Sequence, residues 1–177
     1  MDNPVQLRAV TEADLDAIEG WRHDADHQSE FGNFMSMQRR NGKLRQDWLD
    51  GGLLSKDGGM LVVVAAGDPV GDVQWHPVHY GPNAGSQALN IGIALAPQAR
   101  GRGFGSAAQA LLAEYLFAHT TVNRVEASTD VENLAEQRAL EKAGFTREGV
   151  LRGAQYRQGE WHDMVSYGMV RSDLQRR

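Results

Sequence analysis

The spacing of apolar residues divides the first part of the chain into a strand, two helices and a second strand. Apolar and polar side chains alternate over residues 5–9, as in a half-buried strand. Thr11 then has the properties of an N-cap, and the acidic residues after it favour the first turn of a helix. A second amphipathic helix is expected around residues 44–49. The apolar run over residues 60–66 indicates a buried strand.

The rest of the chain continues this alternation of strands and helices. Four more strands are expected, at residues 70–75, 89–95, 122–129 and 165–169. One helix carries apolar residues at intervals of three and four from Ala108, and another over residues 133–143 is closed by Gly144 in the C′ position. The order β-α-α-βββ-α-β-α-β, without an internal repeat, predicts a single α/β domain over residues 1–177.

Composition narrows the class of protein. Of the 177 residues, 41 % are hydrophobic and 23 % are charged, as in a soluble globular chain. The net charge of −5 argues against a generic nucleic-acid binder, and no apolar run is long enough for a membrane span. Cysteine is absent, which excludes disulfides, thiolate metal ligands and a cysteine nucleophile. Since the first residues do not resemble a secretory signal, a cytoplasmic location is expected.

A glycine-rich turn between the strand at 89–95 and the next helix is the most informative segment. Glycines let the backbone approach a ligand closely, and the first amides of a helix have no internal hydrogen-bond partner. The helix dipole and two arginines add positive charge. The turn therefore predicts a site for phosphate or pyrophosphate. It reads Arg100-Gly101-Arg102-Gly103-Phe104-Gly105-Ser106.

Two other phosphate-binding motifs fit this turn less well. A P-loop needs a lysine and then serine or threonine after its last glycine, whereas Gly105 is followed directly by Ser106. A dinucleotide-binding motif fits residues 103–108, with Glu126 about twenty residues later, but too little chain remains for the further βα units of that fold. A connection without any ligand is the third alternative, and the glycines and arginines at a helix start make it the weaker one.

A family resemblance covers nearly the whole chain. Residues 100–105 resemble the R-x-x-G-x-G acetyl-CoA motif of the GNAT superfamily of N-acetyltransferases. Asn133 and the helix that ends with the sequence of residues 141–145 resemble the second half of that family, especially its RimJ/RimL-type branch. Residues 7–14 and 156–163 resemble the usual start and the C-terminal hairpin of the same branch.

The resemblance implies a mixed, mostly antiparallel central sheet flanked by helices, with two strands that splay apart at the cofactor cleft. It also implies acetyl-CoA as co-substrate and no metal. The strand before the turn would pair with the pantetheine arm, the turn would bind the pyrophosphate, and Asn133 would lie near the thioester. The cofactor-binding residues that the resemblance implies are Ile93, Ala94, Leu95, Arg100, Gly101, Arg102, Gly103, Phe104, Gly105, Ser106 and Asn133.

Three positions depart from patterns seen in this family, and all concern proton transfer. Leu140 stands where many members have a tyrosine as general acid, and Asn90 lies near the position of a strand glutamate that serves some members as base. Glu136, three residues after Asn133, replaces a serine of the RimL-like branch. Glu136 can serve as the acid if it points at the cleft, and a solvated helix residue is the alternative. The expected catalytic residues are Asn133 and Glu136, without an assigned base.

Residues that bind the acceptor are expected in and around residues 23–59, the variable segment where the resemblance is weakest. Glu30, Phe31 and Trp75 are the candidates, because an acidic, aromatic cleft attracts a cationic amine. Core packing is the alternative role for the aromatic residues. His23 and His27 have the spacing of zinc ligands on a helix, but the glutamate of such motifs is missing, so no metal is expected.

Together these patterns predict an acetyl-CoA-dependent N-acetyltransferase that acts on a primary amine of a small molecule, such as an amino acid, a polyamine or an aminoglycoside-like compound. A protein N-terminal α-amine, as in the RimJ/RimL type, is the alternative acceptor. A binding module that keeps the CoA site without catalysis is the alternative from another class, in view of Leu140 and Asn90. No nucleic-acid or membrane partner is expected, and a homodimer is one assembly that the sequence leaves open.

Overall fold

One mixed sheet forms the centre of the protein. The computed structural model describes residues 5–23, 31, 43–55 and 58–176. Within these residues, an eight-stranded sheet has the order β1-β3-β4-β5-β6-β8-β7, with β2 paired to β3. The strands are β1 (Gln6–Ala9), β2 (Leu54–Ser55), β3 (Gly58–Ala65), β4 (Asp68–His79), β5 (Gln87–Leu95), β6 (Arg124–Asp130), β7 (Thr146–Arg157) and β8 (Glu160–Val170).

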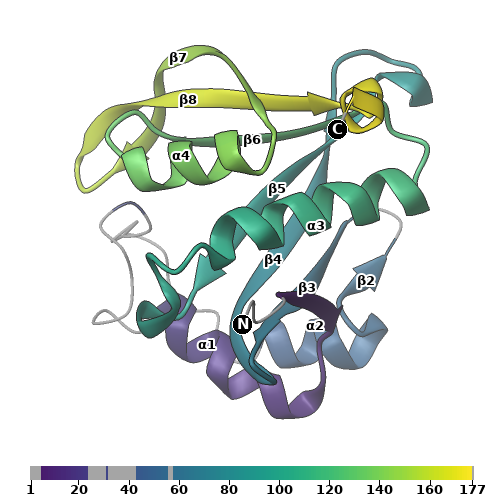
Figure 1. Cartoon of the computed structure of the whole chain (residues 1–177), viewed down its shortest axis with the longest axis vertical. Coiled ribbons are helices and arrows are strands. Elements are labelled where there is room, and N and C mark those ends of the chain that lie inside the picture. Colours follow the sequence, from purple (N-terminus) through teal and green to yellow (C-terminus); the bar gives the residue numbers. More distant parts are fainter. Residues whose placement is uncertain (1–4, 24–30, 32–42, 56–57, 177) are drawn as a thin grey trace.

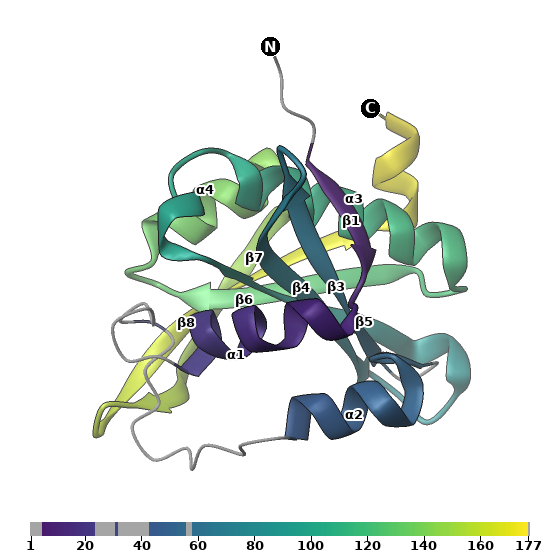
Figure 2. The same cartoon turned by 90° about the horizontal axis from the view of Figure 1, so that it is seen from below.

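Helices cover both faces of this sheet (Figure 1). α1 and α2 lie on one face, and α3 and α4 lie on the other (Figure 2). The α-helices are α1 (Leu15–His23), α2 (Lys43–Gly51), α3 (Phe104–His119) and α4 (Leu134–Lys142), and the 3-10 turns are η1 (Glu12–Asp14), η3 (Ala84–Ser86), η4 (Pro97–Ala99) and η5 (Arg171–Arg176). The predicted α/β fold with flanking helices is confirmed.

Hydrophobic side chains are buried on both faces of the sheet. The cluster under α3 includes Leu112 and Val63, and the cluster under α1 includes Ile18 and Val62; all four side chains are fully buried. Successive residues of β3 therefore point into different clusters, as the pleat of a strand requires. This explains why the segment that forms β3 is apolar at nearly every position rather than at alternate ones.

Asp14 fixes the start of the first helix. Its carboxylate accepts hydrogen bonds from the backbone N–H and the hydroxyl of Thr11, at 2.8 Å and 2.7 Å. The Arg8 guanidinium donates to both carboxylate oxygens, at 2.6 Å and 2.8 Å, and holds the pKa of Asp14 well below its usual range. The predicted helix start after Thr11 is confirmed, and the ion pair connects β1 to the helical segment.

The strands β5 and β6 separate near the middle of the sheet. Their parallel pairing stops after Asn90 and Glu126, although β5 runs on to Leu95 and β6 to Asp130. β4 pairs with the outer edge of β5, and β8 pairs with the outer edge of β6. The facing edges beyond Asn90 and Glu126 thus leave backbone groups for another partner. The expected splay of two strands is confirmed.

Two expectations from the periodicity are wrong. The turn expected at residues 67–69 lies one residue earlier, since Ala66 and Gly67 have positive φ angles of 58° and 89° and β4 already begins at Asp68. The order of elements expected from the periodicity also lacks β7. Most residues of this edge strand are exposed, so no apolar alternation marks it. The hairpin of β7 and β8 instead agrees with the resemblance over residues 156–163.

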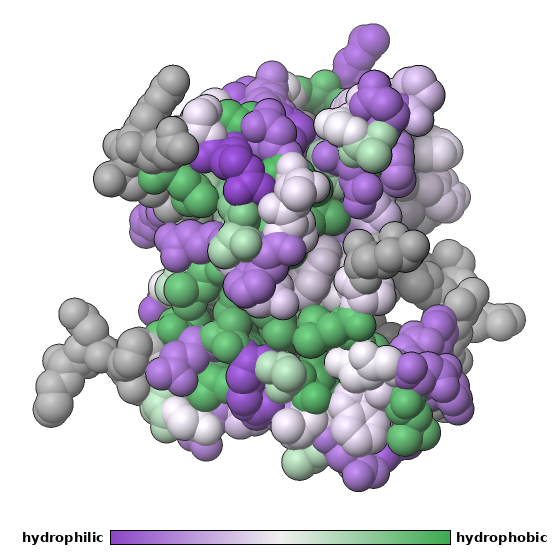
Figure 3. Space-filling model, turned by 90° about the vertical axis from the view of Figure 1, so that its right-hand side faces the viewer, coloured by the Kyte–Doolittle hydropathy of each residue, from purple (hydrophilic) through white to green (hydrophobic). Residues whose placement is uncertain are grey.

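The outer surface mixes hydrophobic and hydrophilic side chains. On the side of the molecule where β2 lies, hydrophobic side chains gather in a band across the lower half of the view, with hydrophilic ones around it (Figure 3). Among the helices of the described segments, none has the length and apolar character needed to cross a membrane.

Candidate active site

A cavity of about 690 Å³ lies where β5 and β6 separate. Its walls include the separated ends of both strands, the start of α3 and one side of α4. Trp21 of α1, Phe31, and Gln155 and Met164 of the β7–β8 hairpin complete it. Since α1 lies on the face opposite α3 and α4 (Figure 2), the cavity is walled by helices from both faces.

The glycine-rich turn forms an open cradle at one end of this cavity. Gly101 and Gly103 have positive φ angles of 71° and 81°, which favour glycine. The first backbone amide to donate within α3 is that of Ala107, which binds the carbonyl of Gly103 at 3.3 Å. The preceding amides remain free for an anion. A Cβ built at Gly103 would have no atom within 4 Å, so space for a ligand lies in front of it.

The charged side chains around this cradle differ partly from those expected. Arg100 lines the cavity, and its Nε donates to the carbonyl of Leu95 at 3.2 Å. Arg102 is exposed and stacks on the ring of Phe104, with 4.8 Å from Cζ to the ring centre, and neither residue is among those that line the cavity. The other expected cofactor-binding residues do line it, namely Ile93, Ala94, Leu95, Gly101, Gly103, Gly105, Ser106 and Asn133.

Two cationic residues of α4 also line the cavity, although the sequence analysis did not include them among the cofactor-binding residues. Arg138 and Lys142 stand four residues apart, so they lie on one side of the helix. Ala135 and Ala139, with the same spacing, line the cavity too. The i, i+4 spacing of cations on the helix after the motif is the signal that could have identified them.

Asn133 is the N-cap of α4. Its Oδ1 accepts from the backbone N–H of Glu136 at 3.2 Å, and its Nδ2 donates to the hydroxyl of Thr129 at 3.0 Å. Both ends of the side-chain amide thus have partners in the protein. Asn133 lines the cavity as expected, and its contacts fix the start of α4 relative to β6.

Glu136 also lines the cavity. This position favours a general acid over a solvated helix residue, the two roles that the sequence left open for Glu136. Burial raises the pKa of its carboxyl group to about 7, from the usual value of 4.5, because the charged form loses water. The nearby side-chain amide of Gln109 opposes this rise. A carboxyl group with this pKa can donate a proton at neutral pH and can be protonated again.

The two other altered positions do not supply a proton donor or acceptor to the cavity. Leu140 is fully buried in the core, and Asn90 lies where β5 still pairs with β6. Neither is among the residues that line the cavity. Glu136 and Asp130 are thus the carboxylic acids among the described residues that line it.

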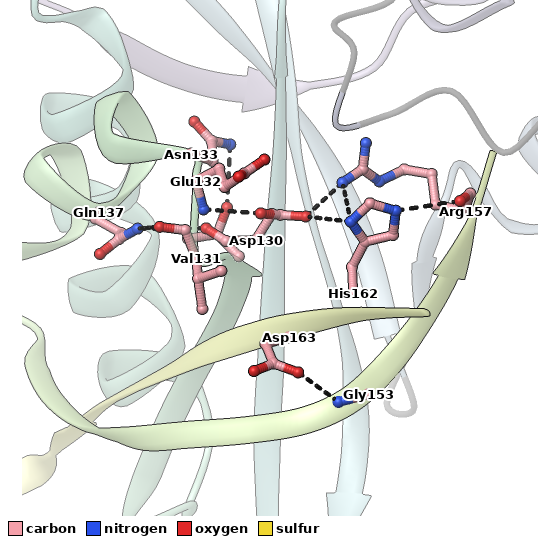
Figure 4. Close-up of polar contacts among 10 residues, drawn as sticks. Asp130, Val131, Glu132, Asn133, Gln137, Gly153, Arg157, His162 and Asp163 are labelled. Atoms are coloured by element: carbon pink, nitrogen blue, oxygen red, sulfur yellow. Dashed lines mark hydrogen bonds and ion pairs between the residues drawn. The ribbon is translucent and has the colours of Figure 1, made fainter. Parts of the chain in front are cut away.

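Asp130 is held in a polar cluster at the end of β6 (Figure 4). Its Oδ2 accepts a hydrogen bond from Arg157 and lies 3.4 Å from Nδ1 of His162, and its Oδ1 accepts from the backbone N–H of Glu132 at 2.8 Å. The Arg157 guanidinium lies over the ring of Phe31, 5.4 Å from its centre. The charge of Asp130 is therefore compensated within the protein, and the cluster connects β6, the hairpin and Phe31.

Of the residues expected to bind the acceptor, the structure describes Phe31 and Trp75, and it places only Phe31 at the cavity. Phe31 lines the cavity, whereas Glu30 lies outside the described residues. Trp75 is buried and packs against Tyr115 of α3, with 5.9 Å between ring centres, so it belongs to the core rather than to the cavity wall. Trp21, which the sequence did not single out for this role, lines the cavity and donates from Nε1 to buried Asp72 at 2.8 Å.

The described segments contain no group of three or more His, Cys, Asp or Glu side chains that could hold a metal ion. His27 lies outside the described residues, so the pair with His23 is not placed.

Comparison with known proteins identifies a family for most of the chain. Residues 5–146 match the family model described as acetyltransferase (GNAT) domain. The chain is 36 % identical over 87 residues to the probable N-acetyltransferase YjcK of Bacillus subtilis (strain 168), an alignment that covers 49 % of this chain and 48 % of that protein. The chain therefore spans about half the length of the curated relatives that it matches.

Solved structures share the fold over almost the whole chain. One is a spermidine N-acetyltransferase from Vibrio cholerae in complex with CoA and spermine, with a TM-score of 0.80, 19 % identity, and coverage of 97 % of this chain and 98 % of that chain. Another is RimJ from Mycobacterium smegmatis in complex with CoA-disulfide, with a TM-score of 0.76, 24 % identity, and coverage of 96 % and 83 %. At these identities, the likeness shows the fold alone.

Proposed function

The chain belongs to the acetyltransferase (GNAT) domain family, and on this premise we propose that it is an acetyl-CoA-dependent N-acetyltransferase whose acceptor is a primary amine of a small molecule. The observation that carries the proposal is the cavity between β5 and β6. It joins an anion-binding cradle, a carboxyl group with a pKa near neutrality and an aromatic wall on the opposite face of the sheet.

The first support is the fit of the cradle end to the CoA moiety. The free amides at the start of α3 and the guanidinium of Arg100 suit a pyrophosphate. The cations Arg138 and Lys142 on α4 suit the additional phosphate of CoA. The free backbone edge of β5 beyond Asn90 offers N–H and C=O groups to the amide groups of the pantetheine arm.

Glu136 supplies the proton that the reaction requires. The amine nitrogen forms a bond to the thioester carbon, and the bond from that carbon to sulfur breaks. Glu136 donates its proton to the sulfur that leaves, and the proton lost from nitrogen returns to the carboxylate through water. Because burial raises the pKa of Glu136 to about 7, its carboxyl group can hold a proton at neutral pH. The replacement of a tyrosine by Leu140 thus does not leave the site without an acid.

The acceptor end fits a small molecule with an apolar or flat part next to its amine. Trp21 and Phe31 form the wall, and each is fixed by a polar partner, Asp72 and Arg157 respectively. The cavity volume of about 690 Å³ lies in the range of small-molecule sites. A structural neighbour, the Vibrio cholerae enzyme, is a spermidine N-acetyltransferase in complex with spermine, which supports an amine of this size.

A CoA-release assay with acetyl-CoA and a panel of amines tests the proposal. The panel contains amino acids, polyamines, aminoglycosides and short peptides with a free N-terminus, and mass spectrometry identifies the acetylated product. Turnover of one small-molecule class, with a raised KM for acetyl-CoA in a Gly105→Ala variant of equal protein stability, would support the proposal. Turnover of peptides alone would contradict the small-molecule acceptor.

A protein N-terminal α-amine is the second candidate acceptor, because RimJ of Mycobacterium smegmatis is among the similar structures. An α-amine has a pKa of about 8, so it needs less help from a base than a lysine-like amine with a pKa of about 10.4. Absence of turnover with every amine, together with a higher Tm in acetyl-CoA, would instead favour the CoA-binding module without catalysis.

A further inference from the structure

The side-chain amide of Gln109 on α3 is buried next to Glu136. Gln109 is 1 % exposed, and its side-chain Nε2 has no hydrogen-bond partner among the described residues. A buried N–H group without a partner costs about 1–3 kcal/mol, so such groups are rare in folded proteins. The neighbouring buried positions of α3 are apolar, among them Ala108 and Leu112. Packing alone therefore does not explain a glutamine here.

The position of Gln109 on α3 directs it toward the cavity and α4. Gly105 and Ser106 line the cavity, and Gln109 follows them by four and three residues, so it lies on the same side of the helix one turn later. α3 packs against α4, whose residues Glu136 and Ala139 line the same cavity. The buried amide thus lies behind the cavity wall, between the anion-binding end of α3 and the first turn of α4.

We propose that Gln109 is a positioning residue that donates a hydrogen bond from Nε2 to the ionised carboxylate of Glu136 and holds this group at the cavity wall. The inference rests on the proposed function, because it assigns Gln109 to the proton transfer that Glu136 performs. When Glu136 has lost its proton, the amide stabilises the charge and keeps the carboxylate next to the sulfur. Because this hydrogen bond stabilises the ionised form, it lowers the pKa of Glu136 and makes its proton easier to transfer.

The other charged groups near Glu136 are accounted for. On α4 itself, Arg138 and Lys142 are among the residues that line the cavity. From β6, Asp130 faces the cavity with its oxygens bound by Arg157 of β7 and by the backbone of Glu132. Arg100 lines the cavity from the turn before α3. Two effects shift the pKa of Glu136. Burial raises it, and the side-chain amide of Gln109 lowers it.

The experiment compares wild type with Gln109→Met, which keeps the length of the side chain and removes the donor. The pKa of Glu136 is measured by NMR of ¹³C-labelled glutamate carboxyl groups, with Glu136→Gln to identify the signal. We expect Gln109→Met to raise the pKa of Glu136 by about one unit and to move the high-pH limb of kcat upward by the same amount. Gln46→Met, which removes a partner of Asp50 on α2, is the matched control and is expected to change neither.

The two possible failures are distinguishable. An unchanged pKa of Glu136 in Gln109→Met would overturn the role of Gln109, whatever the activity. A raised pKa with an unchanged pH profile of kcat would keep the Gln109 contact and overturn Glu136 as the acid. If Gln109→Met does not fold, the side-chain amide signals of Gln109 in wild type are followed against pH. They must shift with the midpoint of Glu136, and a constant position would contradict the proposal.

Discussion

The side-chain Oδ1 of Asn133 accepts a hydrogen bond from the backbone N–H of Glu136 at 3.2 Å, so the residue that caps α4 also places the carboxyl group of the site. The Nδ2 of Asn133 donates to Thr129, which lies on the separated end of β6. The position of the separated end of β6 therefore helps to determine where the first turn of α4 lies. The two hydrogen bonds of Asn133 thus connect the separated end of β6 to the turn of α4 that carries Glu136.

Removal of this cap is expected to reduce both stability and activity. Asn133→Ala should lower the free energy of unfolding by about 1 kcal/mol, because the N–H of Glu136 loses its partner. It should also lower kcat by about tenfold, because the first turn of α4 frays next to the cavity. Asn133→Asp can accept from Glu136 and from the Thr129 hydroxyl, so it should retain most of both quantities.

Urea unfolding and steady-state kinetics of these two variants provide the test. If Asn133→Asp folds as stably as wild type but loses activity as fully as Asn133→Ala, then Asn133 acts by direct contact with the cofactor, as the family resemblance implied, and its role as a cap is secondary.

The anion cradle depends on backbone approach at Gly105. A Cβ at this position would lie 3.6 Å from Leu95 Cδ1 and 3.9 Å from Ile93 Cδ1, which are ordinary contacts, so the fold should accept alanine. The added methyl group lies at the cavity wall, where it keeps a phosphate away from the free amides of α3. Gly105→Ala should therefore keep its Tm and weaken CoA binding by about tenfold or more, which is about 1.4 kcal/mol.

Isothermal titration with CoA measures this effect. Gly149→Ala is the matched control, because a Cβ there meets no atom within 4 Å and the residue lies on β7 outside the cavity lining. Equal affinity of wild type and Gly105→Ala would show that the phosphates bind elsewhere.

Much of this site follows from sequence, and the reasons differ between residues. The cradle is local, since Gly101 and Gly103 need positive φ angles and the helix start is adjacent, so pattern alone places it. Trp75 shows the limit of such patterns. Alternation predicts that it points to one face of the sheet, but which face meets α3 and which meets α1 is decided by tertiary packing.

Glu136 and β7 show two other limits. Helix periodicity did not distinguish a solvated glutamate from one that lines a cavity, because the cavity is created by strand separation far away in sequence. β7 has exposed residues on both faces, so it lacks the apolar alternation on which strand prediction depends. Its contribution to the cavity through Gln155 could not be expected for the same reason.

The ion pair of Asp14 and Arg8 should make the free energy of unfolding depend on pH in the acidic range. The pKa of Asp14 is lower in the folded chain than in the unfolded chain, so the stability it contributes is present at neutral pH and is lost as the pH falls through the acidic range. Asp14→Asn should lower the free energy of unfolding by about 1–3 kcal/mol at pH 7, because Asp14 is buried and the partners of its carboxylate lose a charge.

Chemical denaturation at neutral and acidic pH checks this expectation. The difference between wild type and Asp14→Asn should shrink on acidification. Asp47→Asn, which removes the exposed pair with Lys43, is the matched control and should cost less than about 0.5 kcal/mol. A difference for Asp14→Asn that stays constant with pH would show that the charge of Asp14 is not what stabilises the fold.

The pH dependence of kcat in wild type and in Glu136→Gln measures the role of Glu136 most directly. With an amine that the enzyme acetylates, wild type should lose activity above a pH of about 7, because Glu136 no longer holds the proton for the sulfur. Glu136→Gln should lower kcat by about 10²-fold and should lack this limb. An unchanged kcat and the same limb in Glu136→Gln would contradict Glu136 as the acid of the reaction.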